Sequence, residues 1–227
     1  MVEIPRNGMK VALINNYSEG LGEERIRRLK SIISSFPATF DVIQYHELPV
    51  RRRMNRDIDC LVLSGSDMNI SNAGHRRKME AEIRLIRDIE IPVLAICFGL
   101  QLTAHAFGAK VKRNENSGEW DKDITISILN DPEKLIGLSR VTVNVKHKDY
   151  VRPDDQELLK SFEVRAISAD GALEYVQYAK HRERPLFCVQ FHPECFDRTD
   201  EAVKRDGERI VHNFLGLAGV ERNATAS

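Results

Sequence analysis

Short apolar runs alternate with amphipathic segments along the first half of the chain. Four of these runs are predicted strands: residues 10–15, 40–45, 59–63 and 93–96. Between them, residues 23–36 and 76–89 carry apolar side chains at helical spacing, and residues 23–36 place Arg and Lys on the opposite face. Strands and helices that alternate with short connections predict a parallel sheet covered by helices on both faces.

The pattern changes after residue 108. Short strand candidates follow without long helices between them: residues 124–128, 141–145, 163–168, 173–179 and 186–190. Residues 199–217 then predict a closing amphipathic helix, and the polar residues 221–227 are expected to fray. The expected fold class is therefore α/β, an open and mostly parallel sheet flanked by helices, with a mixed or antiparallel second half. We expect one domain over residues 1–227.

The strand predicted over residues 93–96 ends at a cysteine and turns directly into a helix. Pro92 can begin a strand, and the apolar residues after it suit a strand buried on both faces. Cys97 then lies at the carboxyl end of the strand, and a helix that begins at Phe98 directs its N-terminal N–H groups toward the sulfur. This geometry matches a nucleophile elbow and favours a thiolate. The alternative is an ordinary buried cysteine.

Composition excludes several other classes of protein. Lys and Arg together number 34 and balance 34 Asp and Glu, so no net field recruits nucleic acid or an anionic membrane. No apolar stretch reaches the ~18 residues that span a bilayer, and the first residues do not resemble a signal peptide. The cysteines at positions 60, 97, 188 and 195 form no C-x-x-C pair or zinc spacing. We expect a cytoplasmic protein without a metal or cofactor.

A histidine and a glutamate follow the last predicted strand as His192-Pro193-Glu194. A cysteine nucleophile needs a base within hydrogen-bond reach, and that base needs a third group to orient it. Residues two apart in extended backbone point the same way, and Pro193 favours that geometry. His192 and Glu194 are therefore candidates for these two roles, although for each residue taken alone an exposed position on a loop is the better interpretation.

A turn of small residues follows the strand predicted over residues 59–63, with the sequence Ser64-Gly65-Ser66-Asp67. Such a turn can bring backbone N–H groups close to a reacting carbonyl, although by itself it is an ordinary loop. This turn, Cys97 and His192 all follow predicted strands. Because the carboxyl ends of parallel strands meet at one edge of the sheet, we expect the three segments to converge there.

Two motifs resemble the signatures of class I (triad-type) glutamine amidotransferases: Cys97-Phe98-Gly99-Leu100-Gln101 and Val189-Gln190-Phe191-His192-Pro193-Glu194. The resemblance implies that Cys97 attacks the side-chain amide of glutamine, His192 transfers protons and Glu194 orients His192. It also implies that Gln101 helps to hold the substrate and that N–H groups of Gly65 or Ser66 and of Phe98 bind the oxyanion. Glutamate and ammonia would be the products.

Within the family, the likeness is greatest to the glutaminase subunit of two-subunit GMP synthetases. The segment Lys146-His147-Lys148-Asp149-Tyr150-Val151 is similar to the His-x-Asp-x-Val loop of those subunits. The resemblance implies that His147 faces the glutamine pocket or a docked synthetase, and the alternative is a polar turn at a strand end. The chain holds no G-x-x-x-x-G-K-[ST] motif, so the ammonia is expected to be used elsewhere. The resemblance implies that its user is a separate ATP-dependent synthetase subunit that converts XMP to GMP.

The chain departs from the family at Ser66-Asp67, where the usual residues are Gly-Pro. A positive φ at Ser66 would cost roughly 1 kcal/mol, and the Asp67 carboxylate would repel a developing oxyanion. This departure leaves two other functions open: a stand-alone γ-glutamyl hydrolase or peptidase, and a non-hydrolytic regulatory module with the same fold. The complete Cys-His-Glu set argues against the module.

Overall fold

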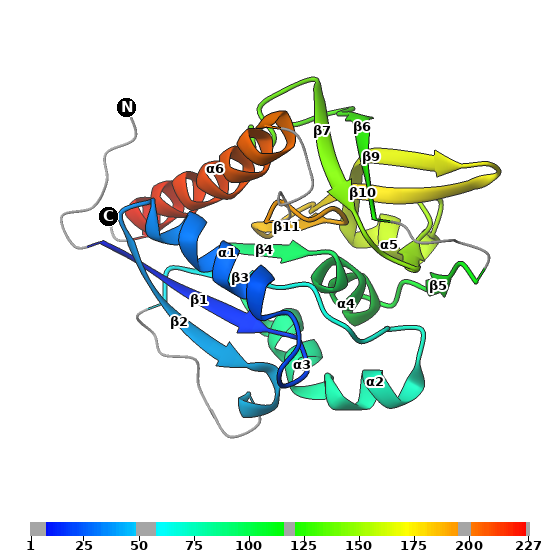
Figure 1. Cartoon of the computed structure of the whole chain (residues 1–227), viewed down its shortest axis with the longest axis horizontal. Helices are drawn as coiled ribbons and strands as arrows, with labels where there is room; N and C mark the ends of the chain where they lie inside the picture. The colour runs from blue at the N-terminus through cyan, green and yellow to red at the C-terminus, as the bar shows by residue number, and fades with distance from the viewer. Residues whose placement is uncertain (1–7, 49–57, 116–120, 195–200, 226–227) are drawn as a thin grey trace.

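A seven-stranded sheet forms the central layer of the protein (Figure 1). The computed structural model describes residues 8–48, 58–115, 121–194 and 201–225. In spatial order the strands are β2 (Ala38–Gln44), β1 (Met9–Asn15), β3 (Cys60–Leu63), β4 (Val93–Ile96), β11 (Leu186–Val189), β10 (Leu173–His181) and β9 (Phe162–Asp170). The strands from β2 to β11 run parallel, and β10 and β9 are antiparallel. The predicted fold class is confirmed.

Helices cover both faces of the sheet, because the side chains of its central strands are apolar on both sides. Along β1, Val11 and Leu13 pack into one cluster with α1 (Glu23–Ser34) and α6 (Glu201–Thr225). The alternate residues Ala12 and Ile14 pack into a second cluster on the other face. That face is covered by α3 (Glu80–Asp88), α4 (Phe98–Ala106) and α5 (Gln156–Ser161).

Two small ladders lie outside the central sheet and carry loops that reach its carboxyl edge. Strand β5 (Val111–Arg113) pairs with β8 (Asp149–Val151), and β6 (Lys122–Ser127) pairs with β7 (Arg140–Val145), both antiparallel. Strands β5 and β8 and helix α5 were not predicted, because segments of three to six residues are too short to show a period.

Two predicted helix boundaries were wrong. The helix predicted over residues 76–89 is divided at Met79 into α2 (Ala73–Lys78) and α3, because Met79 has φ −94° and ψ 5° and its N–H bonds to the Arg76 carbonyl. Asn72 caps the amino end of α2, because its side chain accepts hydrogen bonds from the N–H groups of Gly74 and His75. The closing helix, predicted to end at residue 217, instead continues as α6 to Thr225, in a segment without proline.

The described residues contain neither a membrane-spanning helix nor a cluster of metal-binding side chains. None of the helices there combines the length and the apolar composition that crossing a bilayer requires. No cluster of three or more His, Cys, Asp or Glu side chains in the same ranges is arranged to hold a metal ion. Cys60, Cys97 and Cys188 are buried free thiols, and Cys195 lies outside the described residues.

Candidate active site

The nucleophile elbow predicted at Cys97 is present. Cys97 directly follows β4 and has φ 51° and ψ −100°, and α4 begins at the next residue, Phe98. A β-carbon at Gly99 would lie 3.0 Å from the carbonyl oxygen of Leu63, so the glycine lets the helix pack closely against β3. A positive φ in a non-glycine residue costs of order 1 kcal/mol or more and is typical of functional sites. The turn therefore stores strain at the residue predicted to be the nucleophile.

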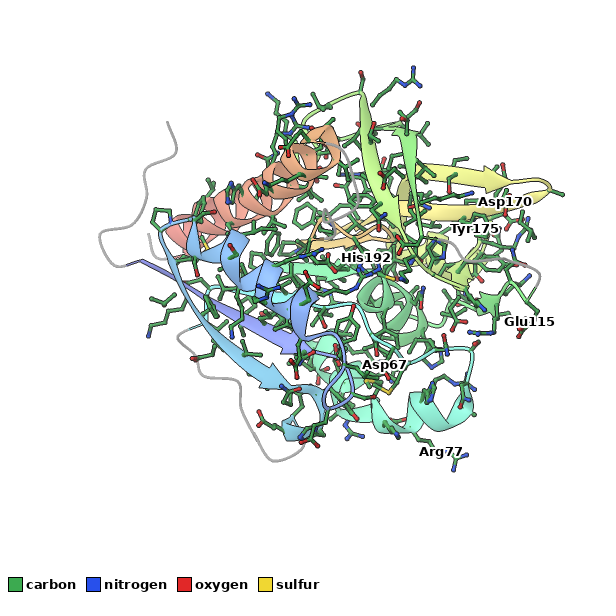
Figure 2. All side chains as sticks on the ribbon, in the orientation of Figure 1. Asp67, Arg77, Glu115, Asp170, Tyr175 and His192 are labelled. Atoms are coloured by element: carbon green, nitrogen blue, oxygen red, sulfur yellow. The ribbon has the colours of Figure 1, made fainter. Side chains whose placement is uncertain are left out.

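The structure brings Cys97, His192 and Glu194 together. Strand β11 lies next to β4, with Val189 opposite Ile96, so the residues that follow β11 reach the elbow. The Nδ1 atom of His192 lies 2.7 Å from Oε1 of Glu194, and a side-chain hydrogen bond joins Cys97 to the His192 ring. Both His192 and Glu194 are buried. Figure 2 shows His192 close to the carboxyl ends of the central strands.

Charges around His192 favour its protonated form. Burial alone would lower the pKa of His192, but its interactions with the Cys97 side chain and the Glu194 carboxylate outweigh burial and raise that pKa to about 9. Burial acts to raise the pKa of Glu194, yet its pKa is lowered by His192 and by Arg25, whose Nη1 lies 3.6 Å from Oε1 of Glu194. An imidazolium next to the sulfur is the arrangement that stabilises a thiolate nucleophile. Sequence reasoning missed Arg25, which lies on α1.

Glu194→Gln tests this electrostatic coupling. The substitution removes a negative charge that raises the pKa of His192, so that pKa falls and the ring loses its proton at lower pH. We expect the alkaline limb of the pH–rate profile to move to lower pH and kcat to fall about 10²-fold, because an orienting group contributes less than the nucleophile. Steady-state rates from pH 6 to pH 10 check this, and an unmoved alkaline limb would contradict it.

A buried glutamine, Gln190, contacts the sulfur. The Nε2 atom of Gln190 lies 3.4 Å from Sγ of Cys97, and Oε1 of Gln190 accepts from Nε2 of Gln101 at 3.3 Å. The same Nε2 of Gln101 donates to the carbonyl of Asp149 at 2.8 Å. Gln101 therefore joins the elbow helix to β8 and to Gln190. Sequence reasoning gave Gln190 no role, since one polar residue in a buried strand carries no periodic signal.

The strain predicted at Ser66 is absent. Among the described non-glycine residues, only Cys97 and Lys134 have a positive φ. The hydroxyl of Ser66 donates to the carbonyl of Asn16 at 2.6 Å. The Asp67 carboxylate accepts hydrogen bonds from the N–H and hydroxyl of Ser18, both at 2.7 Å. The expectation of strain was wrong because it rested on residue type alone, whereas side-chain hydrogen bonds hold this turn in ordinary backbone geometry.

Gly65 lies directly against the histidine. A β-carbon at this position would lie 2.9 Å from Cε1 of His192 and 2.7 Å from the hydroxyl oxygen of Tyr17. Any larger residue would therefore push against the ring that bonds to Glu194. The turn after β3 and the turn after β4 lie at one edge of the sheet, because β3 and β4 run parallel.

A cavity of about 680 Å³ opens beside Cys97. Its walls include four other residues that the sequence proposed for binding: Ser66, Phe98, Gln101 and His147. Charged side chains of both signs complete the wall: Asp121, Lys122, Asp123, Lys146, Lys148 and Asp149. This volume lies in the range of about 300–1,000 Å³ that is typical of small-molecule sites.

His147 is an uncharged part of that wall. Burial lowers its pKa to about 4, although a hydrogen bond to the Asp149 carbonyl acts in the opposite direction. Nδ1 of His147 lies 3.0 Å from that carbonyl oxygen, so Nδ1 carries the proton and Nε2 presents a lone pair. Near neutral pH the side chain can thus accept a hydrogen bond.

Gly207 of α6 lies against the segment that holds the histidine and the glutamate. A β-carbon there would lie 2.2 Å from the carbonyl oxygen of Pro193, so Gly207→Ala must displace the backbone between His192 and Glu194. Because misplacing a catalytic group by about 1 Å can lower the reaction rate about 10²-fold, we expect kcat of Gly207→Ala to fall at least about 10-fold. Gly216→Ala in the same helix is the matched control, because no atom lies within 4 Å of its added carbon. Equal rates for the two variants would contradict this role.

Residues 13–206 match the family model described as glutamine amidotransferase class-I. The chain is 30% identical over 172 residues to a glutamine-hydrolysing GMP synthase subunit from Methanothermobacter thermautotrophicus, covering 74% of this chain and 80% of that protein. It is 31% identical over 216 residues to the protein of the same name from Methanobrevibacter smithii, covering 92% and 96%.

One solved structure shows the same fold over nearly the whole length. The crystal structure of a Thermoplasma acidophilum protein described as a GMP synthase subunit superposes with a TM-score of 0.74 at 24% identity. The superposition covers 97% of this chain and 98% of that one. The arrangement of the central sheet and its helices is thus shared with that protein.

Proposed function

The chain belongs to the class-I glutamine amidotransferase family, and from this premise we propose that it hydrolyses the side-chain amide of L-glutamine to glutamate and ammonia. The observation that carries the proposal is the buried Cys97, His192 and Glu194 set beside a cavity of about 680 Å³. A strained nucleophile, a base and an orienting carboxylate are the groups that acyl transfer to a thiol requires.

The reaction proceeds in two halves. The Cys97 thiolate attacks the amide carbon of glutamine, and the imidazolium of His192 donates its proton to the departing nitrogen, so ammonia leaves and a γ-glutamyl thioester remains. His192, now neutral, takes a proton from water as the water attacks the thioester. The carbon–sulfur bond then breaks and glutamate leaves. Throughout, the bond from Glu194 to Nδ1 keeps Nε2 of His192 directed at the reacting groups.

Backbone N–H groups stabilise the charge that forms on the amide oxygen. Phe98 supplies one at the amino end of α4, where the helix dipole adds positive potential. Gly65 supplies another from the turn that touches His192. One such donor contributes about 10²–10³ in kcat. The Asp67 carboxylate is held in place by Ser18, which donates a hydrogen bond to each of its oxygens.

The charged wall of the cavity suits a zwitterionic amino acid. Free glutamine carries an ammonium and a carboxylate on its α-carbon, so it needs partners of both signs. Lys146 and Asp121 form a pair on the cavity wall, with Nζ of Lys146 2.9 Å from Oδ2 of Asp121. These groups support free glutamine as the substrate, rather than a γ-glutamyl group on a larger molecule.

A separate ATP-dependent synthetase subunit is the proposed consumer of the ammonia. The two relatives above are each named as one subunit of a GMP synthase, which implies a partner subunit. We infer that this partner uses the ammonia to convert XMP to GMP. A reducing cytoplasm is the proposed location, in keeping with the free thiols of Cys60, Cys97 and Cys188.

Glutamine labelled with ¹⁵N in its side-chain amide tests the proposal. The purified protein should release glutamate from glutamine, and with the candidate synthetase, ATP and XMP the label should appear in GMP. Parallel incubations with γ-glutamyl dipeptides test for a stand-alone γ-glutamyl hydrolase. Absence of glutamate release both with and without the synthetase would refute the glutaminase assignment, and release without label in GMP would refute the partner.

A further inference from the structure

A buried polar cluster lies behind the turn that follows β3. Asn16 follows β1, Ser64 follows β3, and Glu82 comes from α3 on one face of the sheet. Asn16 and Ser64 are 0% exposed and Glu82 is 1% exposed. Polar groups so deeply buried are costly unless they are hydrogen-bonded, so their contacts show what the cluster holds in place.

Asn16 holds the turn through both its backbone and its side chain. Its N–H donates to Oγ of Ser64 at 2.9 Å, and its Nδ2 donates to the Ser64 carbonyl at 3.3 Å. Its carbonyl accepts from the hydroxyl of Ser66 at 2.6 Å. Gly65 lies between these two serines, so the position of its N–H depends on the position of Asn16.

Glu82 is the group that fixes the amide of Asn16. Oε1 of Glu82 accepts from Nδ2 of Asn16 at 3.0 Å. Within the described ranges, Oε2 of Glu82 and Oδ1 of Asn16 are both buried without a hydrogen-bond donor. An ionised carboxylate can only accept, but a protonated one carries a donor of its own. One proton on Glu82 can therefore supply the donor that the pair lacks.

We propose that Glu82 is a positioning residue for the Ser64–Ser66 turn, acting as an uncharged carboxylic acid that both accepts from and donates to the amide of Asn16. The role in catalysis rests on the proposed function, because it concerns the N–H of Gly65 that binds the oxyanion. On the edges that face each other, a carboxylic acid and an amide each offer one donor and one acceptor, so the two can form a pair of hydrogen bonds. Such a pair fixes the plane of the Asn16 amide and hence the contact of its Nδ2 with the Ser64 carbonyl.

The electrostatics of Glu82 support the acid form. Burial raises its pKa to about 8 from the ordinary 4.5, while the hydrogen bond from Asn16 acts to lower it, and these are the two influences on it among the described residues. A folded-state pKa above the unfolded value means that the stabilisation is complete below pH 4.5. It is lost progressively as pH rises through about 8.

Melting temperatures of Glu82→Gln and wild type test the acid form without reference to activity. Glutamine has the same shape, keeps a donor and an acceptor, and has no proton to lose. The melting temperature of the variant minus that of wild type should therefore increase as pH rises from 5 to 8. Glu80→Gln is the control on the same helix, since Glu80 is 59% exposed and pairs with Arg84. Parallel melting profiles for Glu82→Gln and wild type would overturn the acid form.

Glutamine kinetics test the positioning role. At pH 7, Glu82→Gln should keep kcat within about twofold, while Glu82→Leu, which removes the partner of Asn16, should lose about 10-fold or more in kcat with KM little changed. The kcat of Glu82→Gln should also persist to higher pH than that of wild type. If Glu82→Leu does not fold, this difference in the alkaline limb still tests the positioning role.

Three results would overturn the positioning role: equal losses in Glu82→Gln and Glu82→Leu, full kcat in a folded Glu82→Leu, or superimposable alkaline limbs for Glu82→Gln and wild type. A wild-type protein that never hydrolyses glutamine would refute the proposed function instead. In that case the melting profiles alone decide whether Glu82 is an acid.

Discussion

Cys97→Ala is expected to lower kcat for glutamine hydrolysis by at least about 10³-fold, because the reaction then lacks the atom that forms the thioester. The protein should still fold, since the substitution removes one buried sulfur atom and keeps the contacts that form the sheet. Cys97→Ser should also be inactive, because a hydroxyl is far less nucleophilic than a thiolate beside an imidazolium. The measurement is glutamate release at saturating glutamine, with circular dichroism to confirm folding.

Cys60→Ala is the matched control for that experiment. Cys60 is also a buried free thiol, and it lies at the start of β3 instead of at the elbow. Its burial raises its pKa far above the ordinary range, so it is neutral at working pH. The variant should hydrolyse glutamine at nearly the wild-type rate. A Cys97→Ala protein that retained more than a tenth of wild-type activity would end the assignment of Cys97 as nucleophile.

His192→Ala is expected to lose about 10³-fold or more in kcat, since the ring serves both halves of the reaction. It protonates the departing nitrogen and later takes a proton from water. The KM for glutamine should change little, because the cavity wall that contacts the substrate is formed by other residues. Steady-state kinetics of the variant check both quantities.

The exposed His46 on the 3₁₀ helix Tyr45–Glu47 provides the control for His192. His46→Ala should leave kcat and KM unchanged. If exogenous imidazole restores activity to His192→Ala, the lost function is proton transfer and not folding. If His192→Ala kept the wild-type kcat and only its KM rose, His192 would act in substrate binding. That result would contradict its role as acid and base.

The elbow could be predicted because its signals are local. Pro92 opens a strand, an apolar run follows, and the helix begins at the residue after Cys97, as the structure shows. His192 and Glu194 are two residues apart after a strand, and that spacing already brings their side chains together. What joins the two segments is the parallel pairing of β4 with β11. The alternation of strands and helices ends before β11, so the sequence pattern predicted only a mixed or antiparallel second half.

The rest of the site depends on contacts between distant segments. Asn16 and Glu82 are 66 positions apart, and the sequence pattern around α3 gives Glu82 no distinction from the exposed Glu80. Gly207 gave no signal either, because only the folded chain places it against Pro193. The error at Ser66 has the same origin: its backbone geometry is set by a hydrogen bond to Asn16, which residue type alone does not show.

The central claim is that glutamine reacts through a covalent bond to Cys97, and mass spectrometry of the acid-quenched reaction tests it most directly. Wild-type protein mixed with glutamine and quenched during turnover should carry a γ-glutamyl group on the peptide that contains Cys97. Cys97→Ala should carry none, and Cys60→Ala should carry it as wild type does. An adduct on a different cysteine, or steady glutamate release with no adduct on Cys97 at any quench time, would contradict the account.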